Sequence, residues 1–232
     1  ARVSDITALN GLPSLSYVDL GDNQIDSLSP LAASPKLDYL QVSANRITSL
    51  APVAGLAMLE SLQAGGNLLE AIDADLPATL TSLQLSSNPI TSLQPLAGLG
   101  LTYLAISSTK VTNLAVLADL PQLRTLSADD LGVTDLKVFP LAQLGSLSAR
   151  DNQVSDIAPL AGLGDLSVDL SNNDVVSLDA AFVGPASRCG GLTLTGNPLD
   201  VAAQARLAWL CEKKLGAEAW DGDSCNFCPI TK

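Results

Sequence analysis

The sequence contains no histidine among its 232 residues. That absence excludes catalytic triads and dyads with a histidine base, and every histidine-ligated zinc, haem or non-haem iron site. Aromatic residues make up only 3% of the chain. No apolar stretch approaches the roughly 18 uninterrupted residues that a membrane-spanning helix needs, so we expect no membrane insertion.

Positive charge is scarce as well. Twelve lysines and arginines face 24 acidic residues, which gives a formal net charge of -12. Nucleic acids and anionic membranes reward clustered positive charge, so we expect no nucleic-acid partner. The chain begins without an initiator methionine or a signal peptide, and we expect it to be processed or an excised piece. What is abundant is aliphatic, because hydrophobic residues make up 47% of the sequence.

One sequence position recurs at intervals of 21 to 24 residues and is asparagine in seven of nine cases. Apolar residues recur at -8, -5, -3, +2, +5 and usually +8 around it, which predicts a repeat architecture. In the first complete repeat these are Leu15, Val18, Leu20, Ile25, Leu28 and Leu31. The recurring position is occupied in turn by Asn23, Asn45, Asn67, Asn88, Thr109, Leu131, Asn152, Asn173 and Asn197.

Each repeat alternates apolar residues at -5 and -3 with mostly polar residues at -6, -4 and -2. This period of two predicts a short strand with one buried face. A single repeat cannot bury its apolar side alone, so neighbouring repeats must stack on a shared core. We expect the asparagine amides to bond backbone groups and form a ladder that is interrupted at Thr109 and abolished at Leu131. Prolines after the strands predict short helical turns, at Pro30, Pro52, Pro95 and Pro159.

The segments SSNPITSLQPLAGLG and RDNQVSDIAPLAGLG carry this pattern most clearly. It resembles the leucine-rich repeat, and its 21–22-residue form is similar to the internalin-type repeat of bacterial surface proteins. The resemblance covers about residues 1–200. It implies an α/β leucine-rich repeat solenoid: a curved right-handed superhelix with a parallel sheet on the concave face, short 3-10 or irregular turns on the convex face, and a C-terminal helical cap.

Three segments follow from the pattern. Residues 1–14 form a partial N-terminal repeat, residues 15–200 a solenoid of nine units, and residues 201–232 a capping helix with a cysteine-containing tail. A solenoid that opens within a repeat exposes an apolar edge. We therefore expect that upstream residues have been lost or that a partner covers this end. A monomer is favoured, and a dimer through the N-terminal edge is the alternative.

The C-terminal segment VAAQARLAWLCEKKLGAEAW changes to helical spacing, which predicts the capping helix, and its last residues AEAW predict an edge strand. All four cysteines lie near this end, at Cys189, Cys211, Cys225 and Cys228. An even, clustered set favours two disulfides and an oxidising compartment, with free thiols as the alternative. A four-cysteine zinc site is disfavoured because only one close pair is present. Among the three pairings we favour Cys211–Cys225, and we expect no metal or cofactor.

The outward strand positions form the candidate binding face. Tyr17 and Tyr39 share one column, and tyrosine is favoured at protein interfaces. A charged group follows later strands, where Asp130 beside Asp151 is unfavourable unless Arg150 offsets it. The candidate protein-binding residues are Tyr17, Asp19, Tyr39, Gln41, Gln63, Gln84, Tyr103, Arg124, Asp129, Asp130, Arg150, Asp151 and Asp169.

The sequence thus favours a non-enzymatic scaffold that binds a protein through its concave face. The internalin resemblance implies secretion or surface display, with a role in adhesion or host recognition. An intracellular scaffold or effector that regulates a partner enzyme is the alternative. A glycan-active enzyme that uses Asp130 and Asp151 ranks third, because a smooth solenoid face supplies no pocket to raise one pKa.

Overall fold

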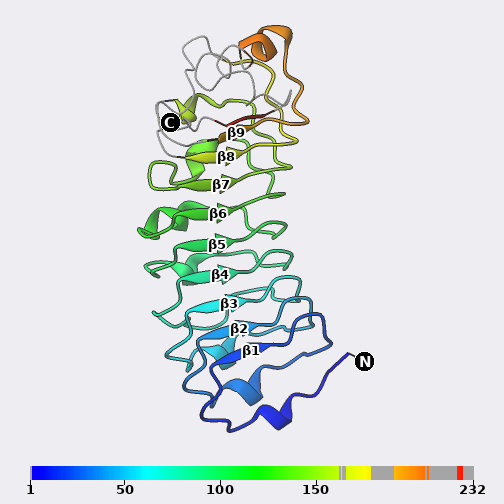
Figure 1. Cartoon of the computed structure of the whole chain (residues 1–232), viewed down its shortest axis with the longest axis vertical. Coiled ribbons are helices and arrows are strands. Elements are labelled where there is room, and N and C mark those ends of the chain that lie inside the picture. The colour runs from blue at the N-terminus through cyan, green and yellow to red at the C-terminus, as the bar shows by residue number, and fades with distance from the viewer. Residues whose placement is uncertain are drawn as a thin grey trace, which may run out of the picture. The chain divides into compact units, whose positions relative to one another are not determined.

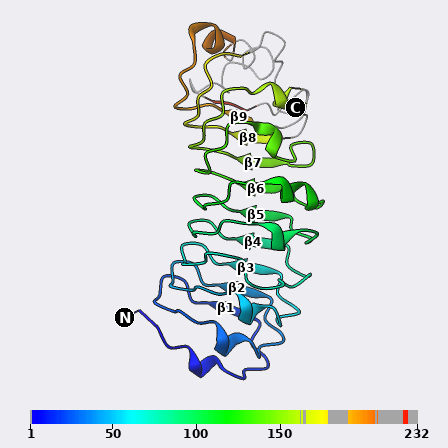
Figure 2. The same cartoon turned by 180° about the vertical axis from the view of Figure 1, so that it is seen from behind.

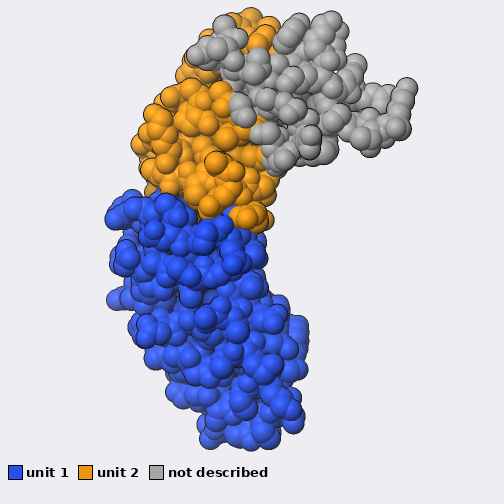
Figure 3. All heavy atoms as spheres, turned by 90° about the vertical axis from the view of Figure 1, so that its left-hand side faces the viewer, with its two compact units in different colours: residues 1–123 blue, residues 124–232 orange. Residues whose placement is uncertain are grey.

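The computed structural model describes residues 2–161, 163, 166–178, 191–206, 208 and 224–226, the last three by their backbone. The chain divides into two compact units, residues 1–123 and 124–232 (Figure 3). In the part of the chain that is described, no helix has the length and apolarity needed to cross a membrane.

Unit 1 contains five strands of three residues each. They are β1 (Tyr17–Asp19), β2 (Tyr39–Gln41), β3 (Ser61–Gln63), β4 (Ser82–Gln84) and β5 (Tyr103–Ala105) (Figure 1). Each strand pairs in parallel with the next, and equivalent repeat positions lie opposite each other, as Leu40 lies opposite Leu62. The middle residue of every strand is buried, so the first and third positions project to the other face, as the alternation predicted.

Unit 2 continues the pattern with β6 (Thr125–Ser127), β7 (Ser146–Ser148), β8 (Ser167–Asp169) and β9 (Gly191–Thr193), which are parallel. The strand β10 (Ser224–Asn226) then pairs with β9 antiparallel, where the sequence predicted no strand. The edge strand predicted for AEAW lies outside the described residues. Residues 201–206 are helical, as expected for the start of the cap, and most of the remaining cap is likewise outside the described residues.

Short 3-10 helices lie between many of the strands, and Figure 2 shows them from behind. Four of them carry a proline in their first two positions, as predicted. The described 3-10 helices are η1 (Thr7–Leu9), η2 (Ser29–Leu31), η3 (Ala51–Val53), η4 (Gln94–Leu96), η5 (Ala115–Asp119), η6 (Leu136–Val138) and η7 (Ala158–Leu160). Within each unit, these turns and the parallel strands confirm the predicted repeat fold.

A polar side chain four residues after the recurring position accepts a hydrogen bond from the first residue of the turn in many repeats. Ser49 Oγ accepts a hydrogen bond from the N–H of Ala51 (3.1 Å). Asp5 Oδ1 accepts one from the N–H of Thr7 (2.8 Å), and this bond lowers the pKa of the Asp5 carboxyl. Such a bond satisfies an N–H group that the start of a helical turn leaves unpaired.

The asparagine amides join successive repeats. Asn67 Nδ2 donates to the carbonyl of Ala64 in its own repeat and to that of Val42 in the preceding repeat, both at 3.0 Å. Its Oδ1 accepts the N–H of Ile47, again from the preceding repeat, at 2.9 Å. The same pattern recurs at Asn45 and Asn88 in unit 1, and at Asn173 and Asn197 in unit 2.

The ladder changes where the sequence predicted. Thr109 Oγ1 donates only to the carbonyl of Ile106 within its own repeat (2.9 Å). Leu131 has no side-chain donor or acceptor, although its backbone N–H still donates to Asn152 Oδ1 (3.1 Å). Both substitutions therefore remove part of the inter-repeat bonding that asparagine supplies elsewhere.

Replacing Asn67 by Ala tests the ladder. The change leaves the Val42 and Ala64 carbonyls and the Ile47 N–H without this partner, in a place where Asn67 itself is only 5% exposed. Because each buried unpaired group costs about 1–3 kcal/mol, we expect the free energy of unfolding to fall by about 3 kcal/mol in urea titrations. The control is Asn10→Ala, an exposed asparagine, with an expected change within about 0.5 kcal/mol. Equal losses in the two variants would contradict this account of the ladder.

Candidate functional site

The outward positions of unit 1 bring seven of the sequence-predicted residues onto one face. The first strand positions carry Tyr17, Tyr39 and Tyr103, and the third carry Asp19, Gln41, Gln63 and Gln84. Because the strands are parallel and in register, residues of one column lie next to each other. The face is built by repetition of the strand, so its chemistry is set by a few columns of side chains.

Tyr17 and Tyr39 form a stacked aromatic pair. Their ring centroids lie 4.6 Å apart and their planes differ by 4°. Adjacent strands lie about 4.8 Å apart, so two rings in one column meet at stacking distance without further adjustment. Tyr17 remains 58% exposed. The pair therefore presents a large, rigid and accessible aromatic area.

The polar residues beside the tyrosines bond mainly to the face itself. Asp19 Oδ1 accepts the N–H of Gly21 (3.0 Å), and Gln41 Oε1 accepts the N–H of Ser43 (2.7 Å). Each side chain thereby holds the backbone as it leaves the strand, which keeps the carboxylate and the amide in place.

The two glutamines further along are also held. Gln63 Nε2 donates to the hydroxyls of Ser61 (3.3 Å) and Ser82 (3.4 Å). Gln84 packs over Gly65, where a Cβ would clash with its amide, and Gln84 Oε1 is buried without a hydrogen-bond partner among the described residues. Glycine at position 65 is therefore what admits this side chain.

The pKa of Tyr39 lies above its ordinary value. Burial beside the stacked ring is the largest cause, and the neighbouring Tyr17 and the negative charge of Asp19 add to it. Each of these opposes formation of the tyrosinate. The Asp19 carboxylate is thus within electrostatic reach of the aromatic pair.

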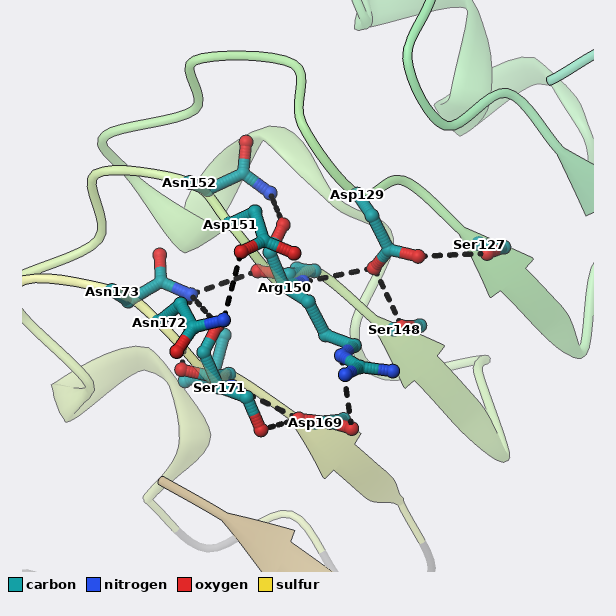
Figure 4. Close-up of polar contacts among 12 residues, drawn as sticks. Ser127, Asp129, Ser148, Arg150, Asp151, Asn152, Asp169, Ser171, Asn172 and Asn173 are labelled. Atoms are coloured by element: carbon teal, nitrogen blue, oxygen red, sulfur yellow. Dashed lines mark hydrogen bonds and ion pairs between the residues drawn. The ribbon is translucent and has the colours of Figure 1, made fainter. Parts of the chain in front are cut away.

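In unit 2 the charged residues form a network rather than a free cluster (Figure 4). Asp129 Oδ1 accepts the Ser148 hydroxyl (2.6 Å) and the backbone N–H of Arg150 (2.9 Å). Its Oδ2 accepts the Ser127 hydroxyl (3.4 Å). The carboxylate therefore ties neighbouring repeats together, much as the asparagines do.

Arg150 forms an ion pair with Asp169. Its Nε lies 3.7 Å from Asp169 Oδ2. Asp151 Oδ1 accepts Asn172 Nδ2 (2.8 Å), and Asp130 is exposed. Arg124 lies just before β6, where its carbonyl accepts two N–H groups of the next repeat.

The residue just before the ladder position adopts the left-handed backbone conformation in every repeat with a described strand. These residues are Asp22, Ala44, Gly66, Ser87, Ser108, Asp130, Asp151, Asn172 and Gly196. Aspartate and asparagine tolerate this conformation better than most residues. The sequence contained the signal, a column rich in Asp, Asn, Ser and Gly, but it was not recognised. The left-handed conformation of the turn therefore accounts for the aspartates at Asp130 and Asp151.

Catalytic features are sparse in the described residues. A small hollow lies in unit 2 between Leu160, Leu163, Leu166, Val168, Gly191 and Leu192, and these lining residues are all apolar. Asp130 and Asp151 do not line it. In the same part of the chain, no three His, Cys, Asp or Glu side chains are grouped to hold a metal ion. The predicted disulfides involve Cys189, Cys211 and Cys228, outside the described residues, and Cys225, which is described by its backbone alone.

Alkaline titration tests the environment of Tyr39. We expect Asp19→Asn to lower the pKa of Tyr39, because it removes a charge that opposes ionisation. Because the folded state raises this pKa, the contribution to stability is present below the unfolded pKa of about 10 and is lost as the pH rises through the folded value. The measurement is tyrosinate absorbance, with Tyr39→Phe to assign the component and Tyr103→Phe as the control. A Tyr39 titration unchanged by Asp19→Asn would contradict this assignment.

The network in unit 2 predicts unequal effects of two adjacent substitutions. Asp129→Asn weakens three hydrogen bonds to a charged acceptor, so we expect the free energy of unfolding to fall by about 1 kcal/mol. Asp130→Asn keeps a residue that tolerates the left-handed conformation, and a change within about 0.5 kcal/mol is expected. Urea unfolding of the two variants at neutral pH measures the difference. Equal stability would show that Asp129 is not structural.

Comparisons with known proteins agree with this geometry. A family model described as a leucine-rich repeat matches residues 77–93. Among curated proteins, none matches the chain. Internalin C2 from Listeria monocytogenes, a solved structure, is 35% identical with a TM-score of 0.65, and the alignment covers 73% of this chain and 77% of that protein.

More distant solved structures share the fold. An internalin (inlF) from Listeria monocytogenes is 24% identical with a TM-score of 0.66, over 82% of this chain and 63% of that one. A chain in the octameric complex of latrophilin 3, Unc5D and FLRT2 is 23% identical with a TM-score of 0.68, over 86% of this chain and 66% of that one. This chain thus spans less than two thirds of the length of these two relatives.

Proposed function

Because this chain belongs to the leucine-rich repeat family, in its internalin-like form, we propose that it is a non-enzymatic scaffold that binds a protein through the outward face of its strands. The observation that carries the proposal is the exposed Tyr17–Tyr39 stack, which lies on a face of unit 1 whose other strand positions are small or amide side chains except for Asp19 and Tyr103. Aromatic anchors surrounded by polar neighbours are the usual composition of an interface centre.

The packing of the repeats supports this role. The strand β3, for example, pairs with β2 on one side and β4 on the other, and the side chain of Asn67 bonds the turn of the preceding repeat. The outward face therefore needs little rearrangement on binding. A related chain lies in an assembly of three kinds of protein, the complex of latrophilin 3, Unc5D and FLRT2. A protein partner is therefore the natural occupant of this surface.

We place the protein outside the cytoplasm, either secreted or displayed on a bacterial surface, with a role in adhesion or recognition of a host or partner. The likeness to internalin C2 and to a second internalin supports this placement. The competing role is an intracellular scaffold. Thiol counting in denaturant separates the two, because four free thiols would remove the argument for an oxidising compartment.

Capture experiments with matched surface variants test the binding face. We expect a partner captured by the wild-type chain to be lost when Tyr17 and Tyr39 are both changed to Ala, with at least a tenfold rise in Kd once the partner is purified. The control is Gln94→Ala, an exposed residue of η4 on a turn between strands, which should bind like the wild type.

A partner that binds the Tyr17, Tyr39 variant as tightly as the control would place the binding surface elsewhere. Sugar release by the wild-type chain that is lost in Asp130→Asn would instead support the glycan-active alternative.

A further inference from the structure

The outward face of unit 1 has an unusual charge composition. The strand positions of β1 to β5 that point outward, and the residues two positions after each strand, include one charged residue, Asp19, and no lysine or arginine. Asp38 and Glu60 immediately precede β2 and β3, and both are exposed. None of these three carboxylates forms an ion pair with a described residue. The basic residues of unit 1, Arg2, Lys36, Arg46 and Lys110, all lie outside the strands.

The aromatic pair lies within this acidic part of the face. One side of the Tyr17 ring is stacked on Tyr39, yet 58% of Tyr17 remains exposed, so much of the ring is open to a ligand. The faces of aromatic rings carry negative potential and attract cations placed within about 6 Å of the ring centre. A planar guanidinium is well suited, because it stacks on the ring and is more weakly hydrated than an ammonium group.

Asp19 supplies the second half of such a site. It lies two residues after Tyr17 on the same strand and therefore on the same face. Its Oδ1 accepts the Gly21 N–H, which orients the carboxylate, and no described residue binds Oδ2. In the register of β1 and β2, Tyr17 lies opposite Tyr39 and Asp19 lies opposite Gln41, so the carboxylate is in the column next to the aromatic pair.

We propose that Tyr17, Tyr39 and Asp19 form a docking point for an arginine side chain on a basic segment of the partner protein. The guanidinium stacks on the exposed part of Tyr17 and donates to Asp19 Oδ2, while Asp38 and Glu60 add long-range attraction. This rests on the proposed function, namely that this face binds a protein, and it specifies the chemistry of that partner.

Charge decides between this occupant and the other candidates. An acidic segment would be repelled by the three carboxylates, since no basic residue on the face offsets them. A purely apolar segment would cover Asp19 and remove water from its Oδ2 without supplying a donor, which costs free energy. An arginine supplies both an apolar plane for the ring and donors for the carboxylate.

The test uses fluorescently labelled glycine–serine peptides that differ only in two central residues, which are arginine, lysine, citrulline or glutamate. Fluorescence anisotropy with the full chain gives the Kd of each. We expect the arginine peptide to bind most tightly and the lysine peptide less tightly. Citrulline, which has the shape of arginine without its charge, should bind several-fold more weakly than arginine, and glutamate more weakly still.

Variants locate the site. Asp19→Asn and Tyr17→Ala should each weaken arginine-peptide binding by about threefold to fivefold, and Tyr17→Phe should retain it, because the ring and not the hydroxyl makes the contact. Gln94→Ala is the control, since Gln94 is an exposed residue of η4 and lies outside the outward strand positions. Dispersed NMR spectra establish that each variant is folded.

Equal binding of the citrulline and arginine peptides would overturn the proposal, as would equal effects of the Asp19, Tyr17 and Gln94 variants. The captured partner separates this failure from failure of the proposed function. If the partner no longer binds the double tyrosine variant but still binds Asp19→Asn, the proposed binding face stands and the arginine docking point is wrong. If the partner binds both variants as it binds the wild type, the proposed binding face is wrong.

Discussion

Within each unit, hydrogen bonds from the recurring asparagine side chain hold successive repeats in register. Where the chain leaves the strand of each repeat, one residue adopts the left-handed backbone conformation, and the asparagine that follows it in most repeats bonds peptide groups around that turn. Asn67 satisfies carbonyls from two repeats and an N–H from the preceding one. Since these groups are buried, a shift of one repeat against the next would leave them unpaired, at a cost that packing of leucines alone does not impose.

The register in turn decides what the outward face looks like. Equivalent positions lie opposite each other along β1 to β5, so any two large side chains in neighbouring repeats of one column must touch. Tyr17 and Tyr39 stack for this reason. In unit 2, diagonal contacts between neighbouring repeats bring Asp129 to the hydroxyl of Ser148 and Arg150 to Asp169, so these charged side chains bond within the structure.

The contrast between the two units bears on function. In unit 2, Asp129, Asp151 and Asp169 are bonded by hydroxyl, amide or guanidinium groups, whereas no described residue binds Oδ2 of Asp19 beside the aromatic pair. A binding face built from small residues gains affinity at few points, so the anchors count for more than the area. The acidic, aromatic corner of unit 1 is where a partner would find the strongest attraction.

The sequence by itself determined the repeat, the strand in each repeat, the buried columns and the bonding role of the asparagines, because these depend on periodic burial and on backbone groups that every repeat shares. It also placed the tyrosines in one column. Only the tertiary structure decided which partner each charged side chain takes. Arg150 pairs with Asp169, and Asp130 adopts the left-handed conformation of the turn, because such details depend on side-chain reach and backbone conformation rather than on sequence spacing. Likewise, the antiparallel β10 depends on a chain reversal that no repeat pattern encodes.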